Sequence, residues 1–224
     1  RRLHLLGVAR GTAELLATLG REMPYAIVEK VSDLPPRELV AQLARSCALG
    51  LIIEEGEGQA RTLRFRHGLV RDAIYERLPA GRREELHRRI AAAAEASFGG
   101  WLAERPDLFA FHFARSGQWL KALELATRAG EQAASKSCHF EACVHLYNGL
   151  DLLERHIPSG PEHDRWELSI RRLLCPSLNA SDGWAAETVQ ENNARLGALG
   201  RAGETQKPLA ELWALFAHAC LRHD

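Results

Sequence analysis

The feature that most constrains the fold is the repeated interruption of helical patterning in the second half of the chain. Beyond Gly99-Gly100 the pattern is helical throughout, and short clusters of glycine, proline and serine break it into segments. A short amphipathic helix cannot bury its own apolar face, so it needs a neighbour. The sequence therefore predicts an α-α superhelix of stacked helical hairpins over residues 99–224.

The interruptions also predict how these helices pair. Residues 118–134 and 137–154 are expected to form one hairpin, 163–175 pairs with 185–199, and 207–222 is a terminal arm. The first hairpin contains the best match to a tetratricopeptide unit, at the offsets where two helices cross closely. The expected packing residues are Gly130, Ala142, Leu146 and Gly149.

The first 98 residues are predicted to form a separate domain, because their apolar pattern changes period. Apolar residues recur at helical spacing in three segments, Val8 to Leu19, Pro24 to Val31 and Pro36 to Ala48. Short apolar segments on either side of Gly56-Glu57-Gly58 predict two strands of one hairpin. Two further helices are expected over residues 69–78 and 82–96. Three helices and a hairpin predict a winged-helix-like domain with trailing helices over residues 1–98, so the fold class is mainly α.

Composition and charge exclude several classes of partner. Lysine plus arginine equals aspartate plus glutamate at 29 each, so no global field draws the chain onto nucleic acid or an anionic membrane. The five cysteines are irregularly spaced, and no secretory leader is recognisable. No apolar run approaches the roughly 18 residues that a membrane span needs. We expect a cytoplasmic protein with no membrane partner.

Motifs for catalysis and for cofactor binding are missing from the sequence. There is no Gly-x4-Gly-Lys-Ser/Thr loop, no Gly-x-Ser-x-Gly elbow and no His-Glu-x-x-His pair. Cys138, His139, Cys143 and His145 lack the spacing of usual zinc ligands. We therefore expect no catalytic residue, no bound metal and no cofactor in this chain itself.

Two segments carry a resemblance to a known group of proteins. They are Phe65 to Tyr75 and Arg82 to His87, and Leu19 to Met23 and Leu178 to Val189 add to the likeness. The sequence resembles the region that follows the ATPase core in multidomain bacterial signal-transducing ATPases. These include adenylate/guanylate cyclases with an AAA-type ATPase and LuxR-like transcriptional regulators. The resemblance implies a regulatory and protein-interaction segment that relays between an upstream nucleotide-binding domain, which holds ATP or ADP, and repeats that bind a protein partner or small-molecule inducer.

The same resemblance implies a role for His67. Related nucleotide-binding regulators often carry Met-His-Asp-Leu-Val at this place, and that histidine helps to hold the β-phosphate of ADP. Here Arg66 and Gly68 flank the histidine. An imidazole can donate a hydrogen bond to a phosphate oxygen, so a nucleotide-sensing role is chemically reasonable. The alternative is structural, with His67 capping the helix that begins at Leu69 or packing beneath the hairpin.

A local excess of positive charge leaves two interpretations open. Residues 61–89 contain nine arginines against four acids. We expect a basic docking face for an acidic or nucleotide-bearing neighbouring domain, formed by Arg61, Arg64, Arg66, Arg71, Arg82 and Arg83. The alternative is a DNA-binding transcriptional regulator that uses Pro36 to Ala48 as its recognition helix. That helix offers few base-reading side chains, namely Arg37, Gln42 and Arg45.

Overall fold

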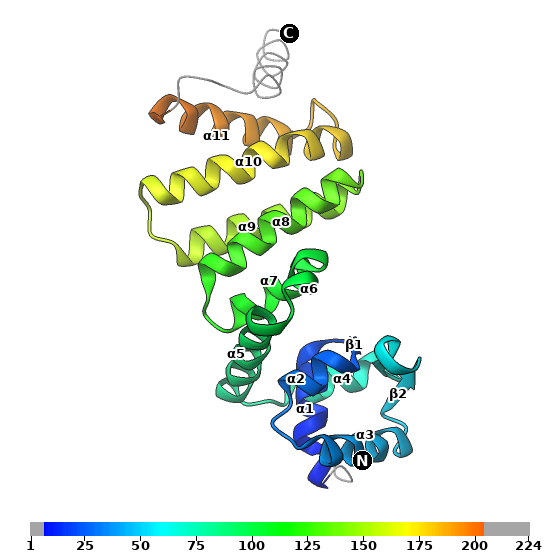
Figure 1. Ribbon diagram of the computed structural model, residues 1–224. Helices are drawn as coiled ribbons and strands as arrows, with labels where there is room; N and C mark the ends of the chain where they lie inside the picture. Colours follow the sequence, from blue (N-terminus) through cyan, green and yellow to red (C-terminus); the bar gives the residue numbers. More distant parts are fainter. Residues whose placement is uncertain (1–6, 204–224) are drawn as a thin grey trace. The chain divides into compact units, whose positions relative to one another are not determined.

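The computed structural model describes residues 7–203, and its chain divides into two compact units, residues 1–102 and 103–224 (Figure 1). The protein is mainly helical and has a small antiparallel sheet. Within residues 7–203, no helix combines the length and the apolar character that crossing a membrane requires. The division between the units falls inside helix α6 (Gly99–Glu104).

The first unit alternates helices with three short strands. Its elements are α1 (Arg10–Leu19), β1 (Glu22–Pro24), α2 (Tyr25–Val31), α3 (Pro36–Ala48), β2 (Ile52–Glu55), β3 (Thr62–Phe65), α4 (Gly68–Glu76) and α5 (Ala80–Ser97), with 3-10 turns at Gly7–Ala9 and Gly58–Ala60. The strand order is β1-β3-β2, and both pairings are antiparallel. The predicted hairpin is therefore present as β2 and β3, and it gains a third strand.

Strand β1 corrects the prediction that a helix begins at Pro24. Met23 lies opposite Leu63 of β3, and Pro24 lies opposite Thr62. Pro24 has extended backbone angles, φ −63° and ψ 140°, and only the next residue starts α2. A proline is tolerated here because β1 is an edge strand that needs no amide donor on its free side. The pairing partner lies far along the chain, so local periodicity could not show it.

The turn of the β2–β3 hairpin requires glycine. Gly56 has φ +77°, a conformation that side chains disfavour. A methyl group added to Gly56 would lie 2.4 Å from the carbonyl oxygen of Ala60. Glycine therefore allows the chain to reverse tightly between the two strands.

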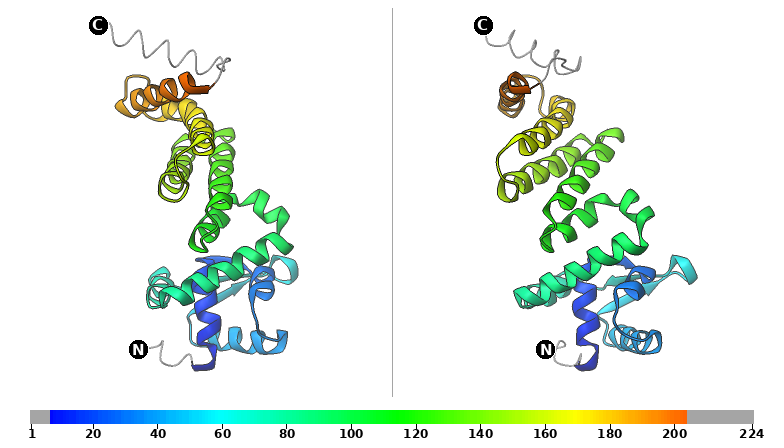
Figure 2. Two further views of the ribbon diagram at one scale, coloured as in Figure 1. Left: turned by 90° about the vertical axis from the view of Figure 1, so that its left-hand side faces the viewer. Right: turned by 60° about the vertical axis from the view of Figure 1, so that its left-hand side comes forward.

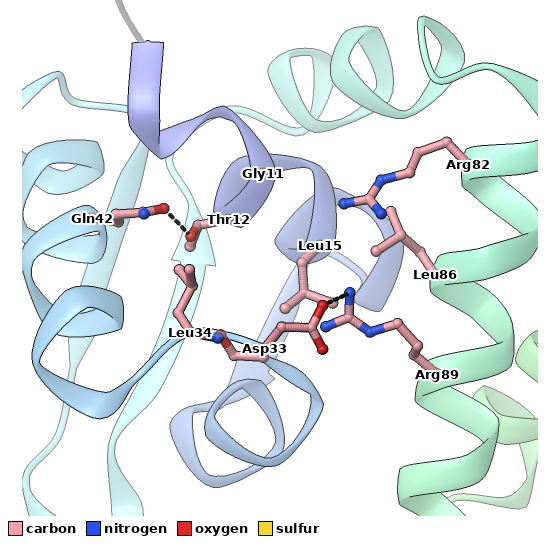
Figure 3. Close-up of a pocket in the computed structure, with 10 residues that line it drawn as sticks. Gly11, Thr12, Leu15, Asp33, Leu34, Gln42, Arg82, Leu86 and Arg89 are labelled. Atoms are coloured by element: carbon pink, nitrogen blue, oxygen red, sulfur yellow. Dashed lines mark hydrogen bonds and ion pairs between the residues drawn. The ribbon is translucent and has the colours of Figure 1, made fainter.

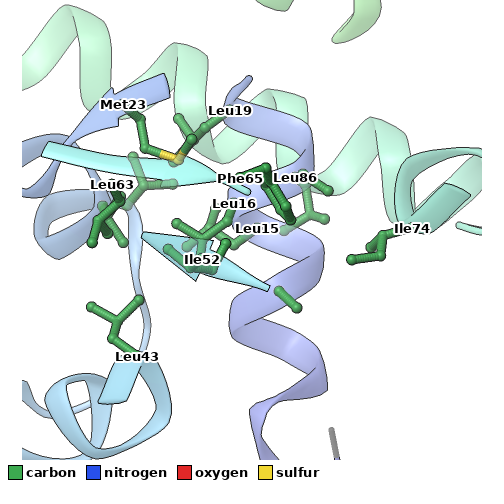
Figure 4. Close-up of a cluster of buried hydrophobic side chains, with 14 of the residues drawn as sticks. Leu15, Leu16, Leu19, Met23, Leu43, Ile52, Leu63, Phe65, Ile74 and Leu86 are labelled. Atoms are coloured by element: carbon green, nitrogen blue, oxygen red, sulfur yellow. The ribbon is translucent and has the colours of Figure 1, made fainter. Parts of the chain in front are cut away.

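The core of the first unit lies between the sheet and helices α1 and α5 (Figure 4). Leu63 and Phe65 alternate with exposed or half-buried neighbours along β3, so one face of the strand is buried. Helix α1 contributes Leu16 and α5 contributes Leu86, and both are fully buried. The inward-facing residues of β3 and the apolar residues at helical spacing in α1 and α5 thus pack together in one cluster.

The second unit is a succession of helices. They are α7 (Pro106–Arg115), α8 (Trp119–Ser135), α9 (His139–His156), α10 (Pro161–Ser181) and α11 (Glu187–Gly203). Each helix packs against the next one along the chain, and α8 also touches α10. Figure 2 shows α8 to α11 as successive antiparallel helices. The predicted hairpin of residues 118–134 and 137–154 is α8 with α9, whereas the predicted arm at 207–222 lies outside the described residues.

Two helix ends differ from the prediction. The helix expected at 163–175 does not end before Pro176, because α10 continues through this proline and ends at Ser181. Leu174 and Leu178 flank the exposed Pro176 and are buried, so the packing of this stripe outweighs the cost of a proline inside a helix. Conversely, the helical pattern after Gly100 is broken at Arg105, because proline at the start of α7 disfavours helical geometry in the residue before it.

Candidate functional site

His67 is the N-cap residue of α4, but its side chain makes no capping hydrogen bond within residues 7–203. Its backbone is extended, and its side chain is exposed. Only its carbonyl oxygen takes part, accepting a hydrogen bond from the amide of Val70 at 3.0 Å. His67 therefore caps α4 through its backbone carbonyl, as the structural alternative expects, while its imidazole is exposed and does not pack beneath the hairpin.

Basic side chains surround the first turn of α4. Arg66 is exposed, and its guanidinium has no ion-pair partner within residues 7–203. The guanidinium of Arg21 lies against Gly68, 3.5 Å from where a methyl group on that glycine would be. The Arg21 side chain is 75% exposed and reaches Asp72 only at 3.9 Å. The Arg21 guanidinium therefore lies at a helix N-terminus that Arg66 and His67 directly precede, an arrangement that suits an anion.

Arg21 is a part of this cluster that the sequence could not reveal. It follows α1 and precedes β1, so 45 residues separate it from Arg66. The pairing of β1 with β3 brings the two segments together, and the amide of Phe65 donates to the carbonyl oxygen of Arg21 at 3.1 Å. Only the unpredicted strand β1 explains why these residues are neighbours.

The predicted basic docking face is largely neutralised within the unit. Arg61 forms an ion pair with Glu54 and stacks over the ring of Tyr25 at 4.0 Å. Arg64 pairs with Glu55 at 2.6 Å. These contacts join the two strands of the hairpin, so both guanidinium groups stabilise the local fold.

The arginines of α4 and α5 are engaged in the same way. Arg71 donates to the carbonyl oxygen of Ala17 at 2.9 Å and to Asp72 at 2.9 Å. Arg82 pairs with Glu85 at 2.8 Å, and Arg83 donates to the carbonyl oxygen of Leu78 at 3.0 Å. Of the six predicted residues, Arg66 alone is exposed without a side-chain partner in the described part. The excess of arginines is visible in the sequence. Their ion pairs with carboxylates and their hydrogen bonds to backbone carbonyls are visible only in the structure.

Helix α3 presents few of the side chains that a DNA reader needs. Gln42 is 7% exposed, and its side-chain oxygen Oε1 accepts a hydrogen bond from the Thr12 hydroxyl at 2.5 Å (Figure 3). The side-chain nitrogen Nε2 of Gln42 donates to the carboxylate of Glu38 at 3.1 Å. The exposed positions of α3 include Arg37 and Arg45, together with Val40, Ala41 and Ala44, whose side chains cannot hydrogen-bond to base edges. The expectation that Gln42 could read a base is therefore wrong.

A small cavity of about 140 Å³ lies beside Thr12 and Gln42, and polar groups that line it bind one another (Figure 3). On its other side Arg89 of α5 pairs with Asp33 at 2.5 Å and donates to the carbonyl oxygen of Val31. Leu86 packs between these polar groups and α1. These hydrogen-bonding groups are occupied by one another, so they hold α5 against the segment between α2 and α3.

The four predicted packing residues of the second unit lie at helix crossings. A methyl group added to Gly130 would lie 2.5 Å from Cγ of Leu146, so α8 and α9 approach as closely as glycine allows. Ala142 and Leu146 are fully buried on α9. Gly149 faces Ile170 of α10, and a methyl group there would lie at an ordinary 3.5 Å. The close crossing expected at these residues is therefore seen where Gly130 meets Leu146, whereas the space at Gly149 would admit a methyl group.

The second unit also contains a polar cleft of about 230 Å³. It is lined by the start of α7, the end of α8 and the start of α9, including Cys138, Glu141 and His145. Arg105 and Asp107 pair across its rim at 3.2 Å, and His145 lies 3.6 Å from Glu141. Its charged groups thus largely satisfy one another.

One group of residues has the composition of a metal site, but its chemistry argues against a cation. Among residues 7–203, the ligand atoms of His163, Asp164 and Glu167 alone converge. Glu167 accepts hydrogen bonds from Arg171 at 2.7 Å and from Arg195 at 2.7 Å on each carboxylate oxygen. The two guanidinium groups hold the pKa of Glu167 at about 2. Two positive charges on the same carboxylate would repel a metal ion.

Comparisons with known proteins relate part of the chain to a much longer protein. No protein-family model matches the chain, and no solved structure matches it. An uncharacterized protein of Rhizobium meliloti (strain 1021) is 28% identical over 154 residues, which are 67% of this chain. The matched region is 15% of that protein's length, so the chain spans a small part of this relative.

Proposed function

We propose that this chain is a non-catalytic regulatory and protein-interaction segment of an ATP-dependent signalling protein. In this proposal the first unit is a winged-helix-like module that contacts an upstream nucleotide-binding domain. The second unit is a set of tetratricopeptide-like repeats that bind a protein partner or an inducer. ATP or ADP belongs to the upstream domain, and the segment relays its state to the repeats.

The element order supports the two fold assignments. The first unit runs helix, strand, helix, helix, strand, strand, with the hairpin folded back onto the first strand. This is the order expected of a winged helix. In the second unit, α8 and α9 cross at Gly130 and Leu146, as the tetratricopeptide offsets predict. The long relative also supports a segment role, because the similar region is a small part of a much larger protein.

The exposed end of α4 is the observation that carries the proposal. The imidazole of His67 is exposed and makes no capping hydrogen bond in the described part of the chain, Arg66 precedes it and is exposed, and the Arg21 guanidinium lies against Gly68. The first turn of a helix offers free amide donors and the positive end of the helix dipole. We propose that these groups contact the phosphates of an ADP held by the upstream domain. This contact would hold the first unit against that domain in its resting, ADP-bound state.

Hydrogen exchange in a full-length protein that carries this segment tests the proposal. With ADP bound, the amides of residues 66–70 should exchange more slowly than after ADP is removed, because the phosphates would occupy the start of α4. The isolated segment provides the control and should show no ADP effect. Equal exchange at residues 66–70 with and without ADP would refute the nucleotide contact.

A further inference from the structure

Helix α9 exposes a row of large apolar side chains. Phe140 is 78% exposed, Val144 43% and Tyr147 41%. Their spacing of four and three residues places them on one side of the helix. The opposite side carries the fully buried Ala142 and Leu146 and packs on α8 and α10. We call Phe140, Val144 and Tyr147 the α9 face.

The border of the α9 face toward α10 and α11 is acidic and ordered. Asp182, in the turn after α10, accepts hydrogen bonds from Ser181 and Thr188, both at 2.7 Å. These hydroxyl groups lower the pKa of Asp182, so its carboxylate keeps its charge in the turn. Glu191 follows on α11 and is exposed.

These acids lie close enough to act on the α9 face. Burial is the main cause that raises the pKa of the Tyr147 hydroxyl, and the charges of Asp182 and Glu191 add to it. Arg171 acts on Tyr147 in the opposite direction, and its guanidinium is bound to Glu167. On the other side of α9, Lys136 lines the polar cleft with Glu141 and His145. The border toward α11 is therefore negative.

We propose that the α9 face, bordered by Asp182 and Glu191, binds a partner segment that carries apolar side chains flanked by lysine or arginine. The inference rests on the proposed interaction role of the repeats and names the chemistry of their partner. Aromatic side chains supply large contact areas at protein interfaces. Carboxylates at the border attract basic partners and disfavour acidic ones.

Two labelled model peptides test the charge preference. One is an amphipathic helical peptide of leucine and lysine, and the other has glutamate in place of every lysine. Fluorescence anisotropy with the full chain at low salt should show that the lysine peptide binds at least about tenfold more tightly than the glutamate peptide. Glu191→Gln should weaken that binding by a few fold and lower its salt dependence. Glu131→Gln, an exposed acid on α8, is the control and should leave it unchanged.

The contact itself is tested by removing the α9 face. The double variant Phe140→Ser, Tyr147→Ser should lose lysine-peptide binding by about tenfold or more, whereas Leu120→Ser, a similarly exposed apolar residue on α8, should not. Thermal melting checks that each variant folds. Undiminished binding by the double variant would overturn the proposal.

The remaining outcomes separate this inference from the proposed function. Tighter binding of the glutamate peptide at the same face would refute the basic partner and leave the interaction role standing. Sedimentation that shows a dimer which the double variant converts to a monomer would assign the face to a second copy and would also refute it. Neither result bears on the ADP contact, which the hydrogen-exchange measurement tests separately.

Discussion

At the scale of single residues, Glu167 shows how strongly the fold can change a side chain. Its carboxylate is 6% exposed and is bound by Arg171 on the same helix and by Arg195 on α11. A carboxylate without such partners would be costly to bury. The hydrogen bonds from Arg195 are the largest cause of its low pKa, and they join α10 to α11. The residue therefore stabilises the end of the helical unit.

The low pKa makes this contribution depend on pH. Because the pKa of Glu167 falls from 4.5 to about 2 on folding, the stabilisation is complete above about pH 5 and is lost between pH 4.5 and 2. Arg195 is half exposed, so we expect Glu167→Gln to cost about 2 kcal/mol at pH 7 rather than the full equivalent of the shift. Urea unfolding at pH 7 and pH 3 measures this difference.

The difference between wild type and Glu167→Gln should shrink at pH 3. Glu187→Gln, an exposed acid in the first turn of α11, is the control and should change stability by less than about 0.5 kcal/mol. An equal cost of Glu167→Gln at both pH values would show that the ion pairs do not stabilise the fold.

At the scale of elements, two glycines in neighbouring helices give opposite predictions. Alanine at Gly130 would place a methyl group 2.5 Å from Cγ of the fully buried Leu146, whereas at Gly149 the nearest atom is 3.5 Å away. Overpacking costs about 1–3 kcal/mol, and alanine gains about 1 kcal/mol over glycine inside a helix. Gly130→Ala should therefore destabilise the chain and Gly149→Ala should be neutral or stabilising.

Thermal melting of the two variants checks the close crossing of α8 and α9. Gly130→Ala should lower the Tm by several degrees, as expected for about 1–2 kcal/mol in a chain of this size. If both variants raise the Tm, then α8 and α9 do not approach each other at Gly130 as described.

The elements also show which parts of the fold local patterns can reveal. Helices α3, α8 and α9 were predicted to within a few residues, because proline or glycine marks their ends and their apolar residues recur at helical spacing. Strand β1 was missed, since its three residues become a strand only by pairing with β3. The helix end predicted before Pro176 was wrong because buried leucines on either side keep the helix intact.

Some residues of the candidate site could be predicted from the sequence and others could not. His67 was identified from its motif, and the structure shows that it is exposed. Arg21 was missed because strand pairing brings it close. Five of the predicted docking arginines turned out to be engaged, since the acids and carbonyls that bind them come from other turns or other elements. Residue types are visible in a sequence, but their partners are not.

At the scale of the whole molecule, equal numbers of acidic and basic residues predict weak DNA binding. Helix α3 exposes Arg37 and Arg45 beside alanine and valine, and most arginines of residues 61–89 are paired. The purified chain should bind duplex DNA without sequence preference, and moderate salt should abolish the binding. Anisotropy titrations with two unrelated duplexes measure this. A salt-resistant complex with one duplex alone would instead favour the transcriptional-regulator interpretation.

The central claim is that the exposed start of α4 serves nucleotide sensing and is not needed for folding. The most direct test measures His67→Ala twice, by the melting temperature of this segment and by the rate of ADP release from a full-length protein that carries it. Arg77→Ala, an exposed arginine at the other end of α4, is the control.

The two measurements should give different results. The segment should change in stability by less than about 0.5 kcal/mol, as exposed positions do. ADP release should become about tenfold faster, the effect of losing one hydrogen bond to a charged phosphate. A destabilised segment together with unchanged ADP release would contradict the account.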